Sequence, residues 1–277
     1  MRNPVGSTAM LLGLGLGVLL ALARCEPAPL SIVTYNIENF PKHDAQIESA
    51  FRTLAGLDAP VVAVQEITDA NALKHAARTE LGSDWKVVVS SDQLAVGLIY
   101  DSDRLSSSDA REHEIGGRKV LEVRLEPRRG PDLRVFVVHL KAGGRDHVNT
   151  RRKQLDALAP IVAHAVASSD DEVVVLGDFN ATQEQDRQQL HRFAAQTGLR
   201  WASASLECTA YWNRRSGRDQ DILEDCPGNA LDHVFTRSVP RSIAAKGLCE
   251  DLGCDGGLIC PAGRFLVSDH CPVLTEL

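Results

Sequence analysis

Short, fully apolar runs that end in polar residues are the feature of this sequence that most restricts its fold. Residues 61–64 read VVAV and lead to Glu66, and residues 173–176 read VVVL and lead to Asp178. An unbroken apolar run of this length is typical of a β-strand that is covered on both faces. Covering both faces of a sheet takes helices or a second sheet on each side, so the sequence predicts a layered α/β domain.

Strand and helix patterns alternate along the chain. Helices are predicted at residues 43–57 and 148–166, where apolar residues recur on one face, at 70–81 from its composition, and at 183–196 as a polar helix. Strands are predicted at residues 30–37, 61–64, 85–90, 94–100, 120–125, 133–140, 173–176, 232–235 and 264–267. Charged residues alternate with apolar ones in 120–125, as on a half-exposed antiparallel strand. No repeat or linker interrupts the pattern, which predicts one domain over residues 26–277.

Residues 1–25 differ from the rest of the chain and predict a signal peptide. Arg2 precedes an apolar and glycine run over residues 10–23, which is shorter than the roughly 20 residues of a membrane-spanning helix. Removal after Ala23 would leave a mature chain without a transmembrane segment, exported to the periplasm or secreted. The alternative is a lipid anchor on Cys25, although Arg24 stands where a lipoprotein cleavage box has a small residue.

A cluster of cysteines near the C-terminus agrees with export. An even number of cysteines in an exported chain predicts disulfides, and the spacing leaves their pairing open. A zinc site would favour C-x-x-C pairs, whereas four residues separate Cys249 from Cys254. The cluster consists of Cys208, Cys226, Cys249, Cys254, Cys260 and Cys271.

Asp178 and Asn180 form part of the phrase GDFN, which directly follows the apolar run 173–176. Gly177 permits an unusual backbone turn that would project both polar side chains towards one side. A carboxylate and an amide at this spacing suit the activation of a water and the binding of a phosphate oxygen. The alternative is an exposed turn, in which Gly, Asp and Asn are common.

Two further phrases place acidic side chains beside apolar runs. Glu66 follows the run 61–64, and a buried carboxylate needs a partner such as a divalent cation. The alternative places Glu66 near the start of the next helix. Asp269 and His270 follow a short apolar stretch, and on a strand their side chains would point to opposite faces. Pro272 argues against a helix N-terminus at this point.

Asn36, His139 and Asp232 complete the set of polar residues at predicted strand ends. Asn36 lies near the end of the first strand, where a turn-forming role is the alternative. His139 lies within an apolar strand, where a hydrogen-bonded core histidine is the alternative. Asp232 and His233 form another Asp–His pair, and one of them is predicted to orient the imidazole of His270.

Charge restricts the choice of partner. The formal net charge is −7, so no overall basic field draws the protein to nucleic acid. Lys141 and the loop at residues 142–145 form a basic turn that is predicted to be flexible and suited to phosphate. Arg151 and Lys153 are predicted to lie on a solvated helix face. Residues 211–215, YWNRR, predict either contacts to a single strand of nucleic acid or a packed loop near the disulfides.

Taken in order, these phrases resemble the endonuclease/exonuclease/phosphatase superfamily, which includes DNase I-like nucleases, sphingomyelinases and inositol phosphatases. The resemblance covers residues 31–277. It implies a four-layer α/β sandwich of two mixed β-sheets flanked by helices, with a magnesium-dependent phosphoesterase site at the strand ends. The implied metal-binding residues are Asn36, Glu66 and Asp269, and the implied catalytic residues are His139, Asp178, Asn180, Asp232 and His270.

The resemblance also implies a role for each catalytic residue. Asp178 would orient or deprotonate the attacking water, and Asn180 would hold a phosphate oxygen. His270 would lie beside the scissile phosphate with Asp232 keeping its ring oriented. His139 matches the second histidine of the DNase I-like and sphingomyelinase-like branches.

The sequence therefore predicts a metal-dependent phosphodiester hydrolase, an exported monomeric endonuclease that uses in-line attack by water. Mg²⁺ is the expected ion, with Mn²⁺ or Ca²⁺ as alternatives, because carboxylate and amide oxygens suit such hard cations. Nucleic acid is the expected substrate, and a phospholipid head group or a small phosphoester is the alternative. A non-catalytic binding module is disfavoured because every implied residue type is present.

Overall fold

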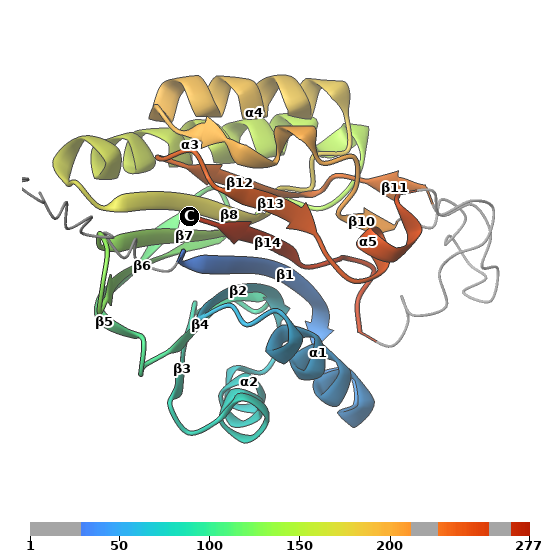
Figure 1. Ribbon diagram of the computed structural model, residues 1–277. Helices are drawn as coiled ribbons and strands as arrows, with labels where there is room; N and C mark the ends of the chain where they lie inside the picture. Colours follow the sequence, from blue (N-terminus) through green and yellow to red (C-terminus); the bar gives the residue numbers. More distant parts are fainter. Residues whose placement is uncertain (1–28, 212–226, 255–266) are drawn as a thin grey trace, which may run out of the picture.

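The computed structural model describes residues 29–211, 227–254 and 267–277. Two six-stranded mixed sheets pack face to face, and helices cover the outer face of each (Figure 1). This four-layer arrangement confirms the predicted fold class. The signal peptide predicted over residues 1–25 lies outside the described residues. Within the described part of the chain, no helix is both long and apolar enough to cross a membrane.

The first sheet has the strand order β13-β14-β1-β2-β4-β3. Its two central strands β1 and β2 run parallel, with Ile32 opposite Val61, and the other neighbours pair antiparallel. Its strands are β1 (Ser31–Phe40), β2 (Val61–Ile67), β3 (Trp85–Val89), β4 (Ala95–Asp101), β13 (Ser242–Ala245) and β14 (Val273–Glu276).

The second sheet has the order β5-β6-β7-β8-β12-β9. Its central strands β7 and β8 run parallel, and β12 runs antiparallel to β8 with Asp232 opposite Asp178. Its strands are β5 (Leu105–Glu114), β6 (Lys119–Pro127), β7 (Leu133–His139), β8 (Glu172–Asp178), β9 (Arg200–Trp201) and β12 (Asp232–Thr236). A separate pair is formed by β10 (Ala210–Tyr211) and β11 (Gly228–Asn229).

The helices lie outside the two sheets (Figure 1). The first sheet is covered by α1 (Asp44–Gly56) and α2 (Ala70–Ala76), and α2 continues into the π-helical turn Ala77–Leu81. The second sheet is covered by α3 (Val148–Ser168) and α4 (Glu184–Thr197), while α5 (Leu248–Leu252) is short. Asp69 caps α2 through its carboxylate, which accepts hydrogen bonds from two backbone amides. Capping by Asp69 leaves the carboxylate of Glu66 available for another role.

Three apolar clusters fill the spaces between the layers. The cluster between the sheets contains Val174 and Leu176, whereas Val173 and Val175 of the same strand face the helices α3 and α4. A third cluster packs β1 and β2 against α1 and α2. Because β8 is covered on both faces, its residues 173–176 are all apolar, which is the pattern that predicted the layers.

Some features of the fold differ from the predictions. Strand β6 is antiparallel as predicted but not half-exposed, because Glu122 is buried between Arg134 (2.5 Å) and His113 (2.6 Å). The polar strand β5 and the short strands β13 and β14 were not predicted. The strand predicted at residues 264–267 lies largely outside the described residues, and the chain is irregular at Val267.

Candidate active site

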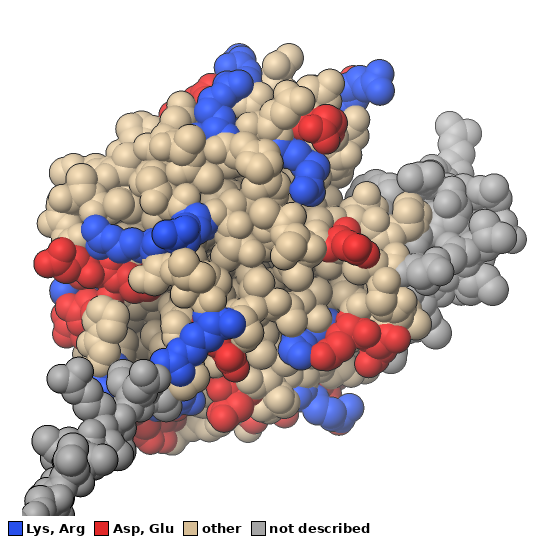
Figure 2. Space-filling model, turned by 45° about the horizontal axis from the view of Figure 1, so that its top comes forward, with Lys and Arg blue, Asp and Glu red and all other residues tan. Residues whose placement is uncertain are grey.

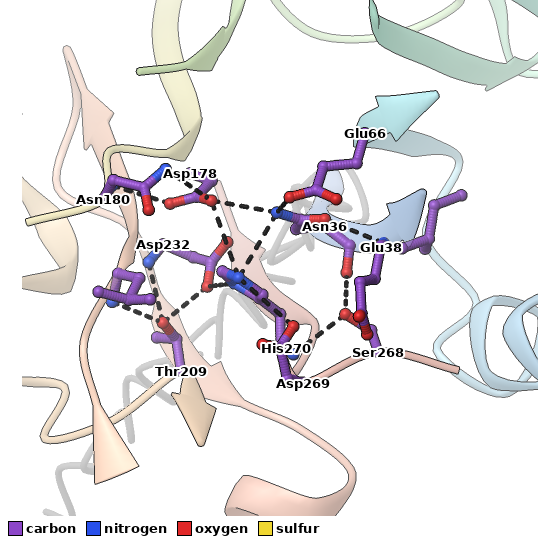
Figure 3. A network of polar contacts seen from close by, with 12 residues as sticks. Asn36, Glu38, Glu66, Asp178, Asn180, Thr209, Asp232, Ser268, Asp269 and His270 are labelled. Atoms are coloured by element: carbon purple, nitrogen blue, oxygen red, sulfur yellow. Dashed lines mark hydrogen bonds and ion pairs between the residues drawn. The ribbon is translucent and has the colours of Figure 1, made fainter. Parts of the chain in front are cut away.

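The site forms where the ends of the central strands of both sheets meet (Figure 3). Asn36 and Glu66 come from the parallel pair β1 and β2, and His139 and Asp178 end the parallel pair β7 and β8. Parallel neighbours present their carboxyl ends at the same edge of a sheet, so each sheet contributes two polar side chains.

Asp232 and His270 reach this edge from strands of opposite direction. We predicted that each polar phrase would follow an apolar run, but Asp232 opens β12 and His270 precedes β14. Because β12 is antiparallel to β8 and β14 is antiparallel to β1, the beginnings of these strands lie at the ends of β8 and β1. Strand direction therefore brings both residues to the same place.

Asn36 connects the two carboxylates that come from different sheets. It is fully buried, and its Nδ2 donates to Glu66 Oε1 (3.1 Å) and to Asp178 Oδ2 (3.1 Å). Glu66 is only half-buried, and its Oε2 accepts a hydrogen bond from the backbone of Asn39. Glu66 adopts a φ of 63°, a conformation that costs a non-glycine residue about 1–3 kcal/mol and is frequent at functional sites.

Gly177 sets the position of Asp178. It has a φ of 145°, and a Cβ atom at this position would lie 1.9 Å from the carbonyl oxygen of Val138. Only glycine lets β8 approach β7 this closely. Asp178 is then held by Asn180, whose backbone amide donates to Oδ1 (2.8 Å) and whose Nδ2 donates to Oδ2 (3.0 Å).

Burial raises the pKa of Asp178 to about 7, with Asp232 and Glu66 adding repulsion and His270 opposing it. The second amide hydrogen of Asn180 donates to the carbonyl oxygen of Leu140 (3.1 Å). The predicted contact of Asn180 to a phosphate oxygen therefore requires one of the two hydrogen bonds donated by its side-chain amide to break.

One ring nitrogen of His270 is hydrogen-bonded to a carboxylate, and the other faces the centre of the site, 3.5 Å from Asn36 Nδ2 (Figure 3). Its Nδ1 donates to Asp232 Oδ2 at 2.7 Å. Burial would lower the pKa of His270, but the charges of Asp232 and Asp178 outweigh burial and raise it well above the usual value. The Nε2 lies 3.8 Å from Asp178 Oδ2 and 3.9 Å from Asp269 Oδ1. A protonated ring therefore points an N–H group at the carboxylates around the site.

Thr209 supports the Asp232–His270 pair and was not predicted. Its hydroxyl donates a hydrogen bond to Asp232 Oδ2 (2.7 Å) and accepts hydrogen bonds from the backbone N–H groups of Leu231 and Asp232. A single threonine beside Cys208 stands in no motif, so only its contacts identify it. Ser268 supports His270 in a similar way. Its hydroxyl donates a hydrogen bond to the backbone carbonyl of Asn36 (2.6 Å) and accepts one from the backbone N–H group of His270.

His139 is buried beside the carboxylates without a hydrogen bond. Its Nε2 lies 3.7 Å from Asp178 Oδ2 and 3.9 Å from Glu66 Oε1, and neither ring nitrogen has a partner among the described residues. Burial, together with the smaller effect of the nearby charge of Arg118, lowers its pKa to about 3. The described residues therefore do not supply the hydrogen bond that the alternative of a core histidine requires.

Two groups of side chains have the geometry to hold a metal ion. One contains Glu66, His139 and Asp178, and the other contains Asp178, Asp232 and His270. Asp269, predicted as a metal ligand, belongs to neither group. Its charge raises the pKa of Glu38, after the larger effect of burial. The structure thus brings Asp269 to the rim of the site (Figure 3).

The basic residues differ from the predictions. Arg151 was predicted on a solvated face, but it is 1% exposed and pairs with Asp186 (2.7 Å). Its guanidinium also donates to carbonyl oxygens of the loop at 141–144, so this loop is tied down where a flexible turn was predicted. Of residues 211–215 only Tyr211 is described, and it is packed against Cys208 and Cys271, as the packed-loop alternative predicted.

Two of the predicted disulfides are present. Cys208 pairs with Cys254 and Cys249 pairs with Cys271, which shows that Cys271 is not a free thiol. Cys226 and Cys260 lie outside the described residues. Cys271 of the second disulfide directly follows His270 in the chain. This disulfide therefore joins α5, which contains Cys249, to the segment that carries His270.

Two sheets with carboxylates and imidazoles gathered at their strand ends define a class of phosphoester hydrolase that works with a divalent metal ion. The chain belongs to the endonuclease/exonuclease/phosphatase family, whose model matches residues 33–270. This confirms the resemblance seen in the sequence. A comparison with curated protein sequences found no match.

Solved structures share the fold at low sequence identity. Danio rerio TDP2 humanized by 14 mutations has a TM-score of 0.69 at 18% identity, over 90% of this chain and 99% of that one. The catalytic domain of human Nocturnin with bound sulfate has a TM-score of 0.69 at 14% identity, over 90% and 93%. A Bacteroides thetaiotaomicron mannosyl-6-phosphatase has a TM-score of 0.66 at 14% identity, over 89% and 98%.

Proposed function

We propose that the protein is an exported, metal-dependent phosphodiester hydrolase, with endonuclease as the favoured activity. The observation that carries this proposal is the arrangement around His270. One ring nitrogen is bound to a buried carboxylate, and the other faces Asp178 across a distance of 3.8 Å. Such a pair of groups suits the activation of a water on one side of a phosphate and the neutralisation of charge on the other.

The residues present fit a divalent metal ion. Glu66 and Asp178 lie close together, share a single amide donor from Asn36, and leave His139 beside them without a partner among the described residues. We assign Glu66 and Asn36 as the residues that hold the ion, with Asp269 contributing from the rim. When bound, a Mg²⁺ ion would supply positive charge that stabilises a phosphate oxygen.

The remaining chemistry belongs to side chains of this chain. Asp178 has a pKa near 7, so its carboxylate can accept a proton from the attacking water at neutral pH. The N–H group at Nε2 of His270 would donate to the developing oxyanion, and Asp232 would keep the ring protonated and oriented. Neutral His139 would bind a phosphate oxygen or the water through a ring nitrogen. Water attacks directly, so no covalent intermediate with the enzyme is needed.

Nucleic acid is the favoured substrate on two grounds. Lys141 and Arg118 lie close enough to lower the pKa of His139, which places positive charge beside the acidic site. A Danio rerio TDP2 of the same fold is described in complex with a single-strand DNA product. Basic and acidic side chains are interspersed over the face drawn in Figure 2, so any contact to a nucleic acid would be local.

A small phosphoester is the second candidate substrate. A cavity of about 260 Å³ opens beside Asn180, which suits a compact group, and one structural neighbour is described as a mannosyl-6-phosphatase. Hydrolysis of phospholipid head groups, as in sphingomyelinases, is the third candidate. Export is supported by the two disulfides together with the apolar run at residues 10–23.

Cleavage of supercoiled DNA by the oxidised mature protein tests the proposal. We expect nicking with Mg²⁺, none with EDTA, and a loss of about 10²-fold or more in Asp178→Asn and His270→Gln. Sphingomyelin vesicles, sugar phosphates and bis(p-nitrophenyl) phosphate are assayed in parallel. Metal-dependent hydrolysis of these esters without nicking would replace the endonuclease by one of the other two candidates. Inactivity of folded protein on every ester would refute the proposal.

A further inference from the structure

A cavity of about 260 Å³ lies beside the reaction centre and takes no part in the chemistry proposed above. It begins at Asn180, whose amide and backbone hold Asp178. From there it extends between the loop that follows β7, the start of α4 and the segment before β12. The residues that line it are Gly143, Gly144, Asn180, Thr182, Gln183, Asn229 and Leu231.

The residues that line the cavity carry no charge. Amide side chains, a hydroxyl and glycine backbone form the wall, and none of the described residues that line the cavity is Lys, Arg, Asp or Glu. The reaction centre next to it, in contrast, contains Glu66, Asp178 and Asp232 within a small volume. A neutral lining with several donors and acceptors matches an uncharged group that forms hydrogen bonds in several directions. A second phosphate would find no cation among these lining residues.

The wall of the cavity is held in place from behind by Arg151. This buried guanidinium donates to Asp186 through Nε (2.9 Å, to Oδ1) and through Nη2 (2.7 Å, to Oδ2). It also donates to the carbonyl oxygens of Gly143 (2.6 Å) and Gly144 (3.3 Å), two residues of the lining. With a further bond to the Lys141 carbonyl (3.1 Å), five directed bonds from one planar group fix the loop relative to α4, so the cavity is present before a substrate binds.

The two glycines of the wall differ in a way that an experiment can use. Gly143 has a φ of 112°, and a Cβ atom there would lie 2.4 Å from the ring of His147, so it cannot be replaced. Gly144 has a φ of −76°, and a Cβ atom there would meet nothing within 4 Å. A side chain at Gly144, one of the lining residues, therefore enters open space.

We propose that this cavity binds one uncharged, hydrogen-bonding ring of the substrate, either a sugar linked directly to the scissile phosphate or a nucleobase joined to that phosphate through its sugar. One water occupies about 30 Å³ of liquid, so the cavity has room for a single ring with its substituents. The ring would hydrogen-bond to the amides of the wall, and its position would place the attached phosphate at Asp178. This inference rests on the proposed function and deepens it, because it names the group that the site selects.

Three diesters with the same p-nitrophenol leaving group test the inference. The second ester group is methyl, a hexose linked through its 6-hydroxyl, or thymidine linked through its 5′-hydroxyl. We expect kcat/KM to be about tenfold or more higher for the hexose or the thymidine diester than for the methyl diester. The larger of the two ratios identifies a sugar or a nucleobase as the group that is bound.

Variants of the wall show whether the cavity causes the preference. Gly144→Leu should reduce the ratio to about one, and Thr182→Val, at an exposed hydroxyl, should reduce it by about threefold. Gly56→Leu is the matched control, because Gly56 on α1 also has open space around it and lies far from the site. Thermal unfolding of each variant confirms that it is folded. A ratio near one in the native protein, or a ratio unchanged in Gly144→Leu, would overturn the inference.

A binding measurement distinguishes a failure of this inference from a failure of the proposed function. The dissociation constants of thymidine 5′-phosphate, glucose 6-phosphate and inorganic phosphate are measured by calorimetry in the presence of Mg²⁺. Tighter binding of an organic phosphate that is lost in Gly144→Leu, without hydrolysis of any diester, would support the cavity and refute the hydrolase. Hydrolysis of all three diesters with equal efficiency would support the hydrolase and refute the cavity.

Discussion

Asn36 Nδ2 donates to Asp178 Oδ2 at 3.1 Å, and this hydrogen bond joins β1 in one sheet to the end of β8 in the other. The same amide group donates to Glu66 Oε1, so one neutral side chain connects two carboxylates. A further bond from Ser268 to the Asn36 carbonyl attaches the segment that carries His270. The position of Asn36 therefore determines how the two halves of the site meet.

Asn36→Ala is expected to lower the free energy of unfolding of the metal-free protein by about 1.5–3 kcal/mol. The reason is that two carboxylates lose a hydrogen bond of the kind made to charged groups. Added Mg²⁺ should recover part of this loss, because the ion would offset the charge that the amide had partly compensated. Urea unfolding with EDTA and with Mg²⁺ measures both effects. Asn71→Ala, on the exposed surface of α2, is the control, and an equal loss in the control would contradict the expectation.

Gly177→Ala is expected to destabilise the protein by more than about 3 kcal/mol. The added methyl group would meet the Val138 carbonyl at 1.9 Å, and the φ of 145° is unfavourable for alanine. Relief of the clash would move Asp178, so activity should fall even where the variant folds. Gly56→Ala provides the contrast, since Gly56 ends a helix with open space around it and alanine should be neutral or stabilise by up to about 1 kcal/mol.

Arg151→Met and Asp186→Leu should each cost about 3–5 kcal/mol, because each leaves a buried charge without its partner. The double variant should cost less than the sum of the two, which a double-mutant cycle of urea unfolding measures. The exposed pair Arg152–Asp156 is the control, and its coupling should not exceed about 0.5 kcal/mol. Additive losses in the buried pair would show that the two side chains act independently.

His233 should make stability depend on pH below neutrality. It is buried against Trp201 and Ser203, and burial lowers its pKa to about 3. The folded state then binds fewer protons than the unfolded state between about pH 3 and 6.5. This contribution to stability is therefore fully present above about pH 6.5 and is lost as the pH falls towards 3.

Replacing His233 by asparagine keeps an acceptor for Trp201 and Ser203 but removes the titration. Between pH 4 and 6, the free energy of unfolding should change with pH less steeply in His233→Asn than in the native protein. The difference should be up to about 1.4 kcal/mol per pH unit, the value for one proton. Urea unfolding in EDTA measures both slopes. His164→Asn, at an exposed position of α3, controls for the loss of a histidine, and equal slopes in all three proteins would contradict the assignment.

Much of the fold was predictable because burial on both faces leaves a direct mark on a strand. The runs at 61–64 and 173–176 are apolar at every position, and both are central strands covered by a sheet and by helices. The edge strand β5 has the opposite character, since residues 106–114 are mostly polar and exposed. Its pairing with β6 comes from the backbone, which periodicity does not report.

The residues of the site were predictable as types but not as partners. The sequence makes it possible to identify Glu66, Asp178 and His270, because polar groups beside apolar runs are expected to be buried and then require a partner. Thr209 does not stand out, since nothing near Cys208 marks a threonine that will hold Asp232. Arg151 was misread as a solvated residue, because a charged residue on a helix is usually exposed and Asp186 lies 35 positions away.

By itself, the sequence determined which segments would be buried and which polar side chains would lie near their ends, because both depend on local composition and spacing. The tertiary structure decided the direction in which each strand runs, and hence that the beginnings of β12 and β14 deliver Asp232 and His270 to the ends of β8 and β1. It also decided that Asn36 would meet Asp178 from the other sheet. Contacts across such separations depend on how the two sheets pack, which no short stretch of sequence contains.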